Sequence, residues 1–298
     1  MGKKREDDMP DIAEREEMML ERGNKAGIVC CSDGLRQDQQ TMIMEMREIL
    51  SRMNISVMMS PYLYEKEGTA IQKAQVLMAL YENTEVDVIF DISGGDLANE
   101  ILGYLDYEKI KQSRKTFWGY SDLTSVLNGI YKKTGNPGVL YQIRNLAGAC
   151  GEEQRVWFGQ MLDHKGEDLF RFEYSFLQGD ELDGIVVGGN IRCLLKLAGT
   201  EYFPEFDGKI LLLESMSGGL SRITAYFSQL QQMGVFARCA GILLGTFTQL
   251  EKEQGILAAP QLLERFVDSS VPVVKTQQIG HGPDSRAVVI GGEMSLHK

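Results

Sequence analysis

The chain has 298 residues and a net charge of −11, from 31 Lys and Arg against 42 Asp and Glu. This acidic balance argues against polymeric nucleic acid or an anionic membrane as a partner, because both are bound through basic surfaces. Hydrophobic residues make up 43% of the sequence. No apolar run, however, approaches the roughly 18 residues that cross a membrane. These numbers predict a globular protein of one or two domains.

Cysteine and histidine usage indicates neither disulfides nor metal. The five cysteines stand at positions 30, 31, 150, 193 and 239, and no C-x-x-C occurs. An odd count without paired spacing does not form a disulfide framework or a zinc site. The three histidines also lack metal-ligand spacing. We therefore expect no metal and no cofactor, a reducing cytoplasmic setting and no secretory signal.

The first half of the chain alternates short apolar runs with amphipathic stretches. Residues 1–24 precede this pattern and are rich in charges of both signs, which predicts a solvated extension. Residues 25–150 then predict a domain of βαβ units around a parallel sheet. Its predicted strands lie at 26–31, 55–60, 86–92 and 115–120, and its predicted helices at 40–53, 69–82, 97–104 and 123–133.

The alternation of predicted strands and helices is interrupted at the start of the second half. Residues 151–183 are polar with scattered aromatic side chains, and we interpret them as a linker or long functional loop between domains. A second domain is predicted over 184–298. Its predicted strands lie at 184–187, 209–213, 241–246 and 271–279.

Three residue types needed for acyl transfer stand where predicted strands end. Active sites of parallel sheets gather at the carboxyl ends of the strands. Ser121 follows one strand, Glu214 follows a second, and His281 follows a third between two glycines. Two of them have an ordinary alternative: Ser121 as a helix cap, and Glu214 as a solvated carboxylate. The pair Gly94-Gly95 ends another strand, either as a tight turn or as a segment whose N–H groups face an anion. Together the three side chains form the inventory of nucleophilic catalysis.

Several motifs in one order resemble the LD-carboxypeptidase and microcin-immunity family of serine peptidases. The run Gly119-Tyr120-Ser121-Asp122-Leu123-Thr124 resembles the family's nucleophile motif, although it is not the G-x-S-x-G motif of α/β-hydrolases. The further segments that resemble the family are Ile92-Ser93-Gly94-Gly95, Gly188-Gly189-Asn190, Leu212-Leu213-Glu214 and Ile279-Gly280-His281-Gly282. They extend over nearly the whole chain.

The resemblance implies a fold and a set of roles. The fold is α/β, with an N-terminal Rossmann- or flavodoxin-like parallel-sheet domain, a smaller mixed α/β C-terminal domain, and the active site in the cleft between them. Ser121 is then the nucleophile, His281 the general base, and Glu214 the residue that orients the imidazole. The backbone N–H groups of Gly95 and Asp122 form the oxyanion hole.

The resemblance also implies a substrate class. The family's best-known members remove a terminal D-alanine from murein tetrapeptides in the cytoplasm during cell-wall recycling, without a cofactor, and homodimers are expected. A small peptide is therefore the expected partner. Gly94, Asn190 and Trp157 are the predicted substrate-binding residues.

Two other functions stay open. An immunity-type peptidase would cleave an amide in peptidyl- or aminoacyl-nucleotide conjugates, and Trp157 would then offer a stacking surface for the base, unless it packs the loop onto the domain. A non-catalytic ligand-binding protein would keep the crevice without turnover.

One departure from the family affects substrate recognition. Ser93 stands where the murein-recycling branch often has arginine before its glycine pair. A compensating cation is therefore expected to bind the substrate's terminal carboxylate, and arginine suits that geometry best. Arg144, Arg192 and Arg222 are the candidates, each with a surface ion pair as the alternative.

Overall fold

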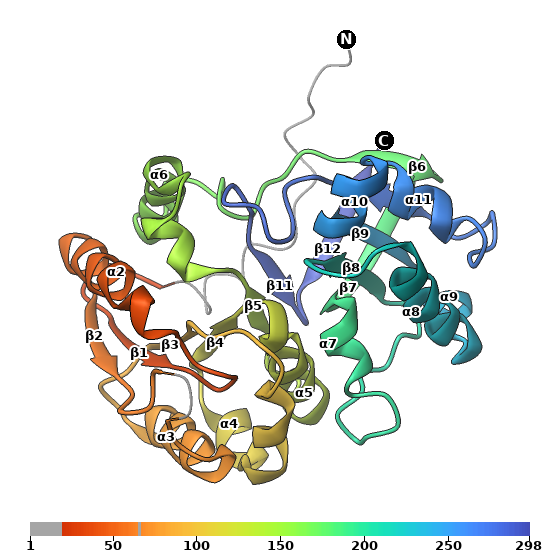
Figure 1. The fold of residues 1–298 in the computed structure, drawn as a ribbon. Coiled ribbons are helices and arrows are strands. Elements are labelled where there is room, and N and C mark those ends of the chain that lie inside the picture. Colours follow the sequence, from red (N-terminus) through yellow and green to blue (C-terminus); the bar gives the residue numbers. More distant parts are fainter. Residues whose placement is uncertain (1–19, 65–66) are drawn as a thin grey trace.

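Residues 20–64 and 67–298 are described by the computed structural model, so most of the predicted extension at 1–24 lies outside the described residues. The chain has an α/β fold with two six-stranded mixed sheets (Figure 1). The predicted fold class is thereby confirmed. None of the helices in the described part is long and apolar enough to span a membrane.

The first sheet has the strand order β2-β1-β3-β4-β5-β11, in which β1 to β5 are parallel. The order 2-1-3-4-5 is the flavodoxin-like arrangement, whose loops diverge between β1 and β3 and leave a crevice there for ligands. The strands are β1 (Lys25–Val29), β2 (Ser56–Met59), β3 (Val88–Asp91), β4 (Thr116–Gly119), β5 (Gly138–Leu140) and β11 (Val288–Ile290).

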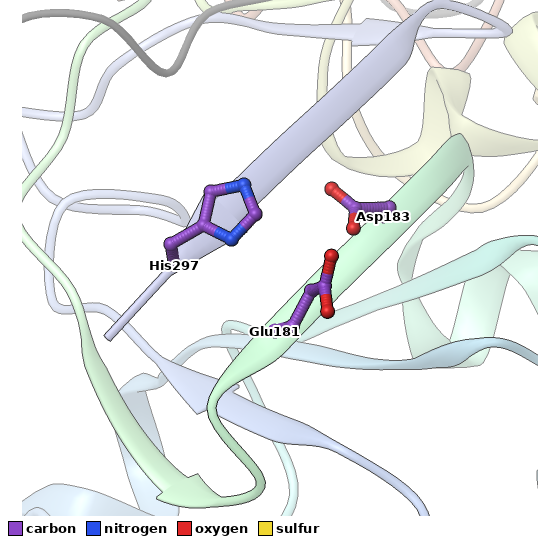
Figure 2. A group of neighbouring side chains, drawn as sticks. All are labelled: Glu181, Asp183 and His297. Atoms are coloured by element: carbon purple, nitrogen blue, oxygen red, sulfur yellow. The ribbon is translucent and has the colours of Figure 1, made fainter.

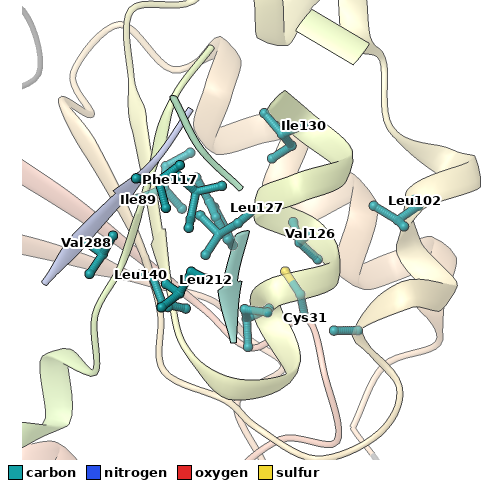
Figure 3. Packing of buried hydrophobic residues seen from close by; sticks show 14 of the residues in the cluster. Cys31, Ile89, Leu102, Phe117, Val126, Leu127, Ile130, Leu140, Leu212 and Val288 are labelled. Atoms are coloured by element: carbon teal, nitrogen blue, oxygen red, sulfur yellow. The ribbon is translucent and has the colours of Figure 1, made fainter. Parts of the chain in front are cut away.

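Helices cover both faces of this sheet, so β3 and β4 are buried on both sides. They are α2 (Gln40–Arg52), α3 (Ala70–Glu82), α4 (Tyr107–Gln112), α5 (Thr124–Thr134) and α6 (Gly151–Leu162). Helix α5 lies between the two sheets and is buried along its first seven residues. In Figure 3 its Val126, Leu127 and Ile130 share one core cluster with Phe117 of β4 and Leu212 of the second sheet.

The second sheet has the order β12-β7-β8-β9-β10-β6, with a parallel centre and an antiparallel strand at each edge. Its strands are β6 (Ser175–Gln178), β7 (Glu181–Asn190), β8 (Ile210–Ser215), β9 (Gly241–Phe247), β10 (Val273–Lys275) and β12 (Glu293–His297). Its helices are α7 (Ile191–Leu195), α8 (Leu220–Gln232), α9 (Val235–Arg238), α10 (Thr248–Gln254) and α11 (Ala258–Leu263).

The C-terminal end of the chain adds one strand to each of the two sheets. Strand β11 comes from the end of the sequence but pairs antiparallel with β5 in the first sheet. The next strand, β12, returns to pair with β7 in the second sheet. Polar contacts also join the halves, since the Asn128 amide of α5 both donates to and accepts from the main chain of Gly188, at 2.9 and 2.8 Å.

The structure differs from the predicted elements at three places. Residues 151–183, predicted as a linker or loop, contain α6 and β6. Helix α6 escaped prediction because polar Gln154 occupies a fully buried position and interrupts the apolar period. The strand predicted at 271–279 is confined to β10, since polar residues follow it. The helix predicted at 97–104 is a 3-10 helix, Ala98–Tyr104.

Candidate active site

Ser121 lies on a sharp turn between β4 and α5. Its φ is +55°, a left-handed conformation that is uncommon for a residue with a side chain. Gly119 allows this turn to close, because a Cβ there would lie 2.6 Å from Leu123. Such strained backbone concentrates at functional sites, where the surrounding structure maintains it. The turn places the Ser121 side chain at the carboxyl end of the sheet.

Glu214 is the penultimate residue of the apolar strand β8, and its carboxylate is almost completely buried, with 2% of the side chain exposed. Gly245 on the neighbouring strand β9 leaves room for it, since a Cβ at that position would lie 3.1 Å from the Glu214 Cβ. Glu214 Oε2 lies 2.7 Å from His281 Nδ1. Its other oxygen, Oε1, has no hydrogen-bond partner among the described residues.

The loop that carries His281 is fixed from two sides. Inside the loop, the Ser285 hydroxyl donates to the carbonyl oxygen of Gly280 at 2.5 Å. From outside, the Gln154 amide donates to the carbonyl oxygens of Pro283 and Ser285, both at 3.1 Å. The buried glutamine that obscured α6 in the sequence therefore anchors the histidine loop.

His281 lies between Ser121 and Glu214. Its Nε2 is 3.1 Å from Ser121 Oγ, on the side of the ring opposite to Glu214. The Tyr120 ring packs against the imidazole with a centroid distance of 4.6 Å. Burial raises the pKa of the Tyr120 hydroxyl well above its ordinary value, so this phenol stays neutral beside the site. The arrangement can pass a proton from a serine hydroxyl to an imidazole that a carboxylate orients.

Asp122, which follows Ser121, is fully buried and joins three segments. Its Oδ2 accepts hydrogen bonds from the Ser32 hydroxyl at 2.7 Å and from the Ala98 N–H at 2.8 Å. Its Oδ1 pairs with Lys196 Nζ at 2.5 Å. This network ties the segment after Gly95 to the turn that carries Ser121. The backbone N–H groups of Gly95 and Asp122 have no hydrogen-bond acceptor in the described part of the chain.

The predicted substrate-binding residues lie in different settings. Gly94 is in a partly exposed loop where a side chain would meet nothing within 4 Å. Asn190 is 3% exposed, and its side-chain oxygen accepts from the Cys193 N–H at the start of α7. Trp157 is 8% exposed, with the Arg286 guanidinium 3.2 Å from its ring centroid. The Trp157 face is thus already covered by a cation.

The three candidate arginines also differ. Arg192 pairs with the Asp96 carboxylate and donates to the carbonyl oxygen of Gly95 at 2.9 Å. Arg222 is exposed on α8. Arg144 is partly buried beyond the end of β5, and its Nε donates to the Gln142 side chain at 3.2 Å.

The Arg144 guanidinium has no carboxylate partner within the described residues, and its two terminal nitrogens donate to none of them. The Arg144 guanidinium lies near Tyr120, and burial lowers the pKa of Arg144. A guanidinium remains charged under all ordinary conditions. Arg144 is therefore a cation beside the site with donors available for a ligand. Ser93, by contrast, is buried, and its hydroxyl donates to Asp91 at 2.6 Å.

One group of side chains elsewhere has the composition of a metal site. Glu181 and Asp183 on β7 face His297 on β12, with candidate ligand atoms within 4.8 Å of one another (Figure 2). Both carboxylates are exposed. At about 3.3 Å per residue, Glu181 lies about 30 Å along β7 from Asn190, which borders the Ser121 turn. The group is therefore remote from the residues described above.

Sequence reasoning did not identify Ser32, Tyr120 or Lys196 as parts of the site. Ser32 lies three residues beyond the end of β1, and Tyr120 directly follows β4, so their places after strand ends were a usable signal. Lys196 gave no such signal, because it follows a short helix of the second sheet and reaches the first only through the tertiary fold.

Sequence profiles of two domains match the chain. The LD-carboxypeptidase N-terminal domain matches residues 26–142, and the LD-carboxypeptidase C-terminal domain matches residues 183–296. The chain is 28% identical to the microcin C7 self-immunity protein MccF of Escherichia coli, over 78% of this chain and 77% of that protein. It is 27% identical to a probable murein peptide carboxypeptidase of Bacillus subtilis, over 74% and 72% of the two chains.

A solved structure of MccF in complex with glutamyl sulfamoyl guanosine has the same fold. The TM-score is 0.82 with 21% sequence identity, and the match covers 94% of this chain and 98% of the other.

Proposed function

This chain belongs to the LD-carboxypeptidase family, and on that basis we propose that it is a serine carboxypeptidase in which Ser121, His281 and Glu214 form the catalytic triad. The hydrogen-bonded order Ser121–His281–Glu214, at 3.1 and 2.7 Å, carries the proposal. These distances fall within the reach that proton transfer requires. The noncatalytic alternative explains neither this alignment nor the left-handed φ of Ser121.

In the proposed reaction, Ser121 Oγ attacks the carbonyl carbon of the last amide bond while His281 Nε2 takes the hydroxyl proton. The negative charge of the tetrahedral intermediate falls on the former carbonyl oxygen, where the N–H groups of Gly95 and Asp122 are the proposed donors. His281 then gives its proton to the leaving amine, and the C–N bond breaks. Water, deprotonated by His281, hydrolyses the acyl-enzyme and restores Ser121. Glu214 accepts a hydrogen bond from the Nδ1–H group of His281 throughout.

The proposed substrate is a peptide with a free terminal carboxylate, such as a murein tetrapeptide ending in a D-amino acid, in the cytoplasm. Arg144 supports this choice, because it offers guanidinium donors near the site. The immunity-type alternative needs an aromatic surface on which the base can stack. Arg286 already covers the ring of Trp157, so this observation does not favour that alternative. The homodimer implied by the resemblance stays a prediction that light scattering would test.

A substrate comparison tests the proposal. The protein is incubated with a tetrapeptide ending in L-residue–D-alanine, with the same peptide as its C-terminal amide, and with an aminoacyl sulfamoyl nucleoside, and products are identified by mass. We expect release of D-alanine from the free acid alone, unchanged by EDTA, and no product from Ser121→Ala. Cleavage of only the nucleoside would favour the immunity-type activity. Full activity of Ser121→Ala would contradict the triad.

A further inference from the structure

Two cations, Arg192 in α7 and Lys196 directly after it, reach from the second sheet to the segments that carry the proposed oxyanion donors. Lys196 Nζ donates to Asp122 Oδ1 at 2.5 Å and to the carbonyl oxygen of Asp96 at 2.7 Å. Arg192 donates to the carbonyl oxygen of Gly95 at 2.9 Å and pairs with the Asp96 carboxylate. Both residues thus hold the main chain on which Gly95 lies.

The conformation of Gly95 makes these contacts consequential. Its φ is +126°, and a side chain there would collide with the Asp33 carboxylate, so the position requires glycine. A glycine has the widest choice of backbone conformations, and its N–H direction is fixed only by what holds its neighbours. Hydrogen bonds to the carbonyl oxygens of Gly95 and Asp96 supply that restraint from the second sheet.

Charge gives Lys196 a second role. The Asp122 carboxylate is fully buried, and the N–H of the same residue is the other proposed oxyanion donor. An uncompensated carboxylate at that depth would repel the negative charge that develops in the transition state, because the interior screens charge weakly. Lys196 is the cation that pairs with it, with 18% of the lysine side chain exposed.

We propose that Lys196 is a positioning residue for the oxyanion hole: it neutralises Asp122 and, with Arg192, fixes the loop that carries the Gly95 N–H. This inference rests on the proposed function, because it presumes an oxyanion formed at Ser121. It means that the second sheet contributes to transition-state stabilisation through α7, as well as through Glu214 and His281.

A matched control lies at the other end of α5 from Asp122. Lys133 on α5 pairs with Glu201 at 2.8 Å and also joins the two halves of the chain, but it lies on the exposed surface. Lys133→Met removes an ion pair between the halves without touching Asp122 or the Gly95 loop. Lys133→Met therefore measures what the loss of an exposed ion pair between the halves does by itself.

The test compares the two variants by steady-state kinetics and by the rate at which a fluorophosphonate labels Ser121. For Lys196→Met we expect kcat and the labelling rate to fall roughly tenfold to hundredfold, somewhat less than loss of a direct oxyanion donor, with KM nearly unchanged. Lys133→Met should match the wild type in both. In Lys196→Met/Asp122→Asn, removal of the unpaired charge should restore part of the lost labelling rate.

Wild-type rates in Lys196→Met would overturn the proposal. The neutralising role would be overturned if the double variant labelled no faster than Lys196→Met, provided that Asp122→Asn alone keeps the wild-type melting temperature. Labelling depends on no peptide, so these comparisons hold whichever substrate is cleaved. A wild type that neither labels nor cleaves any tested amide would overturn the serine chemistry itself, and this proposal with it.

Discussion

The two sheets contribute to the candidate site by different physical means. The first sheet contributes mainly through its main chain: the left-handed turn at Ser121 and the glycine at position 95, both at the carboxyl ends of strands. The second contributes side chains that are buried or paired, namely Glu214, His281 and Lys196. Backbone conformation governs one half of the site, and electrostatics governs the other.

This difference separates two kinds of sensitivity to mutation. Where backbone conformation shapes the site, a substitution must tolerate the local φ, so it first changes the free energy of unfolding. A site of buried charges depends on the balance of desolvation and pairing, so isosteric substitutions can remove function while packing is preserved. Three predictions test whether the division is real, and they are ordered from the largest effect to the smallest.

Glu214→Gln should reduce kcat by about 10³–10⁴-fold, because an amide no longer selects the imidazole tautomer that accepts a proton from serine. The melting temperature should not fall, since the substitution keeps the volume and removes a buried charge. Stopped assays and thermal melts measure both. Glu293→Gln, at an exposed position on β12, is the matched control. Activity within tenfold of the wild type would show that His281 does not depend on Glu214.

Arg144→Ala should reduce the preference for a free acid over its C-terminal amide by about tenfold to hundredfold, which corresponds to about 1.5–3 kcal/mol for a hydrogen bond to a charged group. The measurement is kcat/KM on the two peptides. Arg222→Ala, which removes an exposed arginine from α8, should leave the preference unchanged. If only Arg222→Ala narrows the preference, the terminal carboxylate binds on the other side of the site.

Ser121→Gly should be more stable than Ser121→Ala by about 1 kcal/mol, because only glycine adopts the left-handed conformation without steric cost. At an ordinary helical position the order is reversed, and Ala225→Gly in α8 should lose about 1 kcal/mol. Denaturant unfolding of the inactive pair measures the difference. A glycine variant less stable than the alanine variant would show that the turn at Ser121 is unstrained.

The sequence predicted those elements whose apolar pattern is local. The helix predicted at 40–53 is α2, and the strand predicted at 115–120 contains β4, because amphipathic periods and continuous apolar runs report burial directly. Strands β5 and β11 have three residues each, too few to show a period. Helix α6 was missed because tertiary contacts of Gln154, including a 2.7 Å hydrogen bond from the Tyr141 hydroxyl, override the local pattern.

Those site residues that stand at the ends of predicted strands could be predicted from the sequence. Ser121, Glu214 and His281 could be nominated from their positions, and the structure brings them within hydrogen-bond distance of one another; their catalytic roles stay predictions. The sequence did not show which acidic residues the cations of the second sheet would pair with. Arg192 lies in the short helix α7 and Lys196 directly after it, and only the packing of that helix against the first sheet selects Asp96 and Asp122 as their partners.

Strand β11 makes the completion of the first sheet depend on the last part of the chain to be synthesised. Until Val288–Ile290 has been made, the outer edge of β5 has no strand beside it. At usual synthesis rates the wait between β5 and β11 is on the order of ten seconds. The turn with Ser121 is formed from strands made early, yet His281 and the strand that closes the sheet both arrive near the end. A chain interrupted before residue 281 would therefore carry Ser121 without His281, and the proposed triad would be complete only after most of the second sheet has been made.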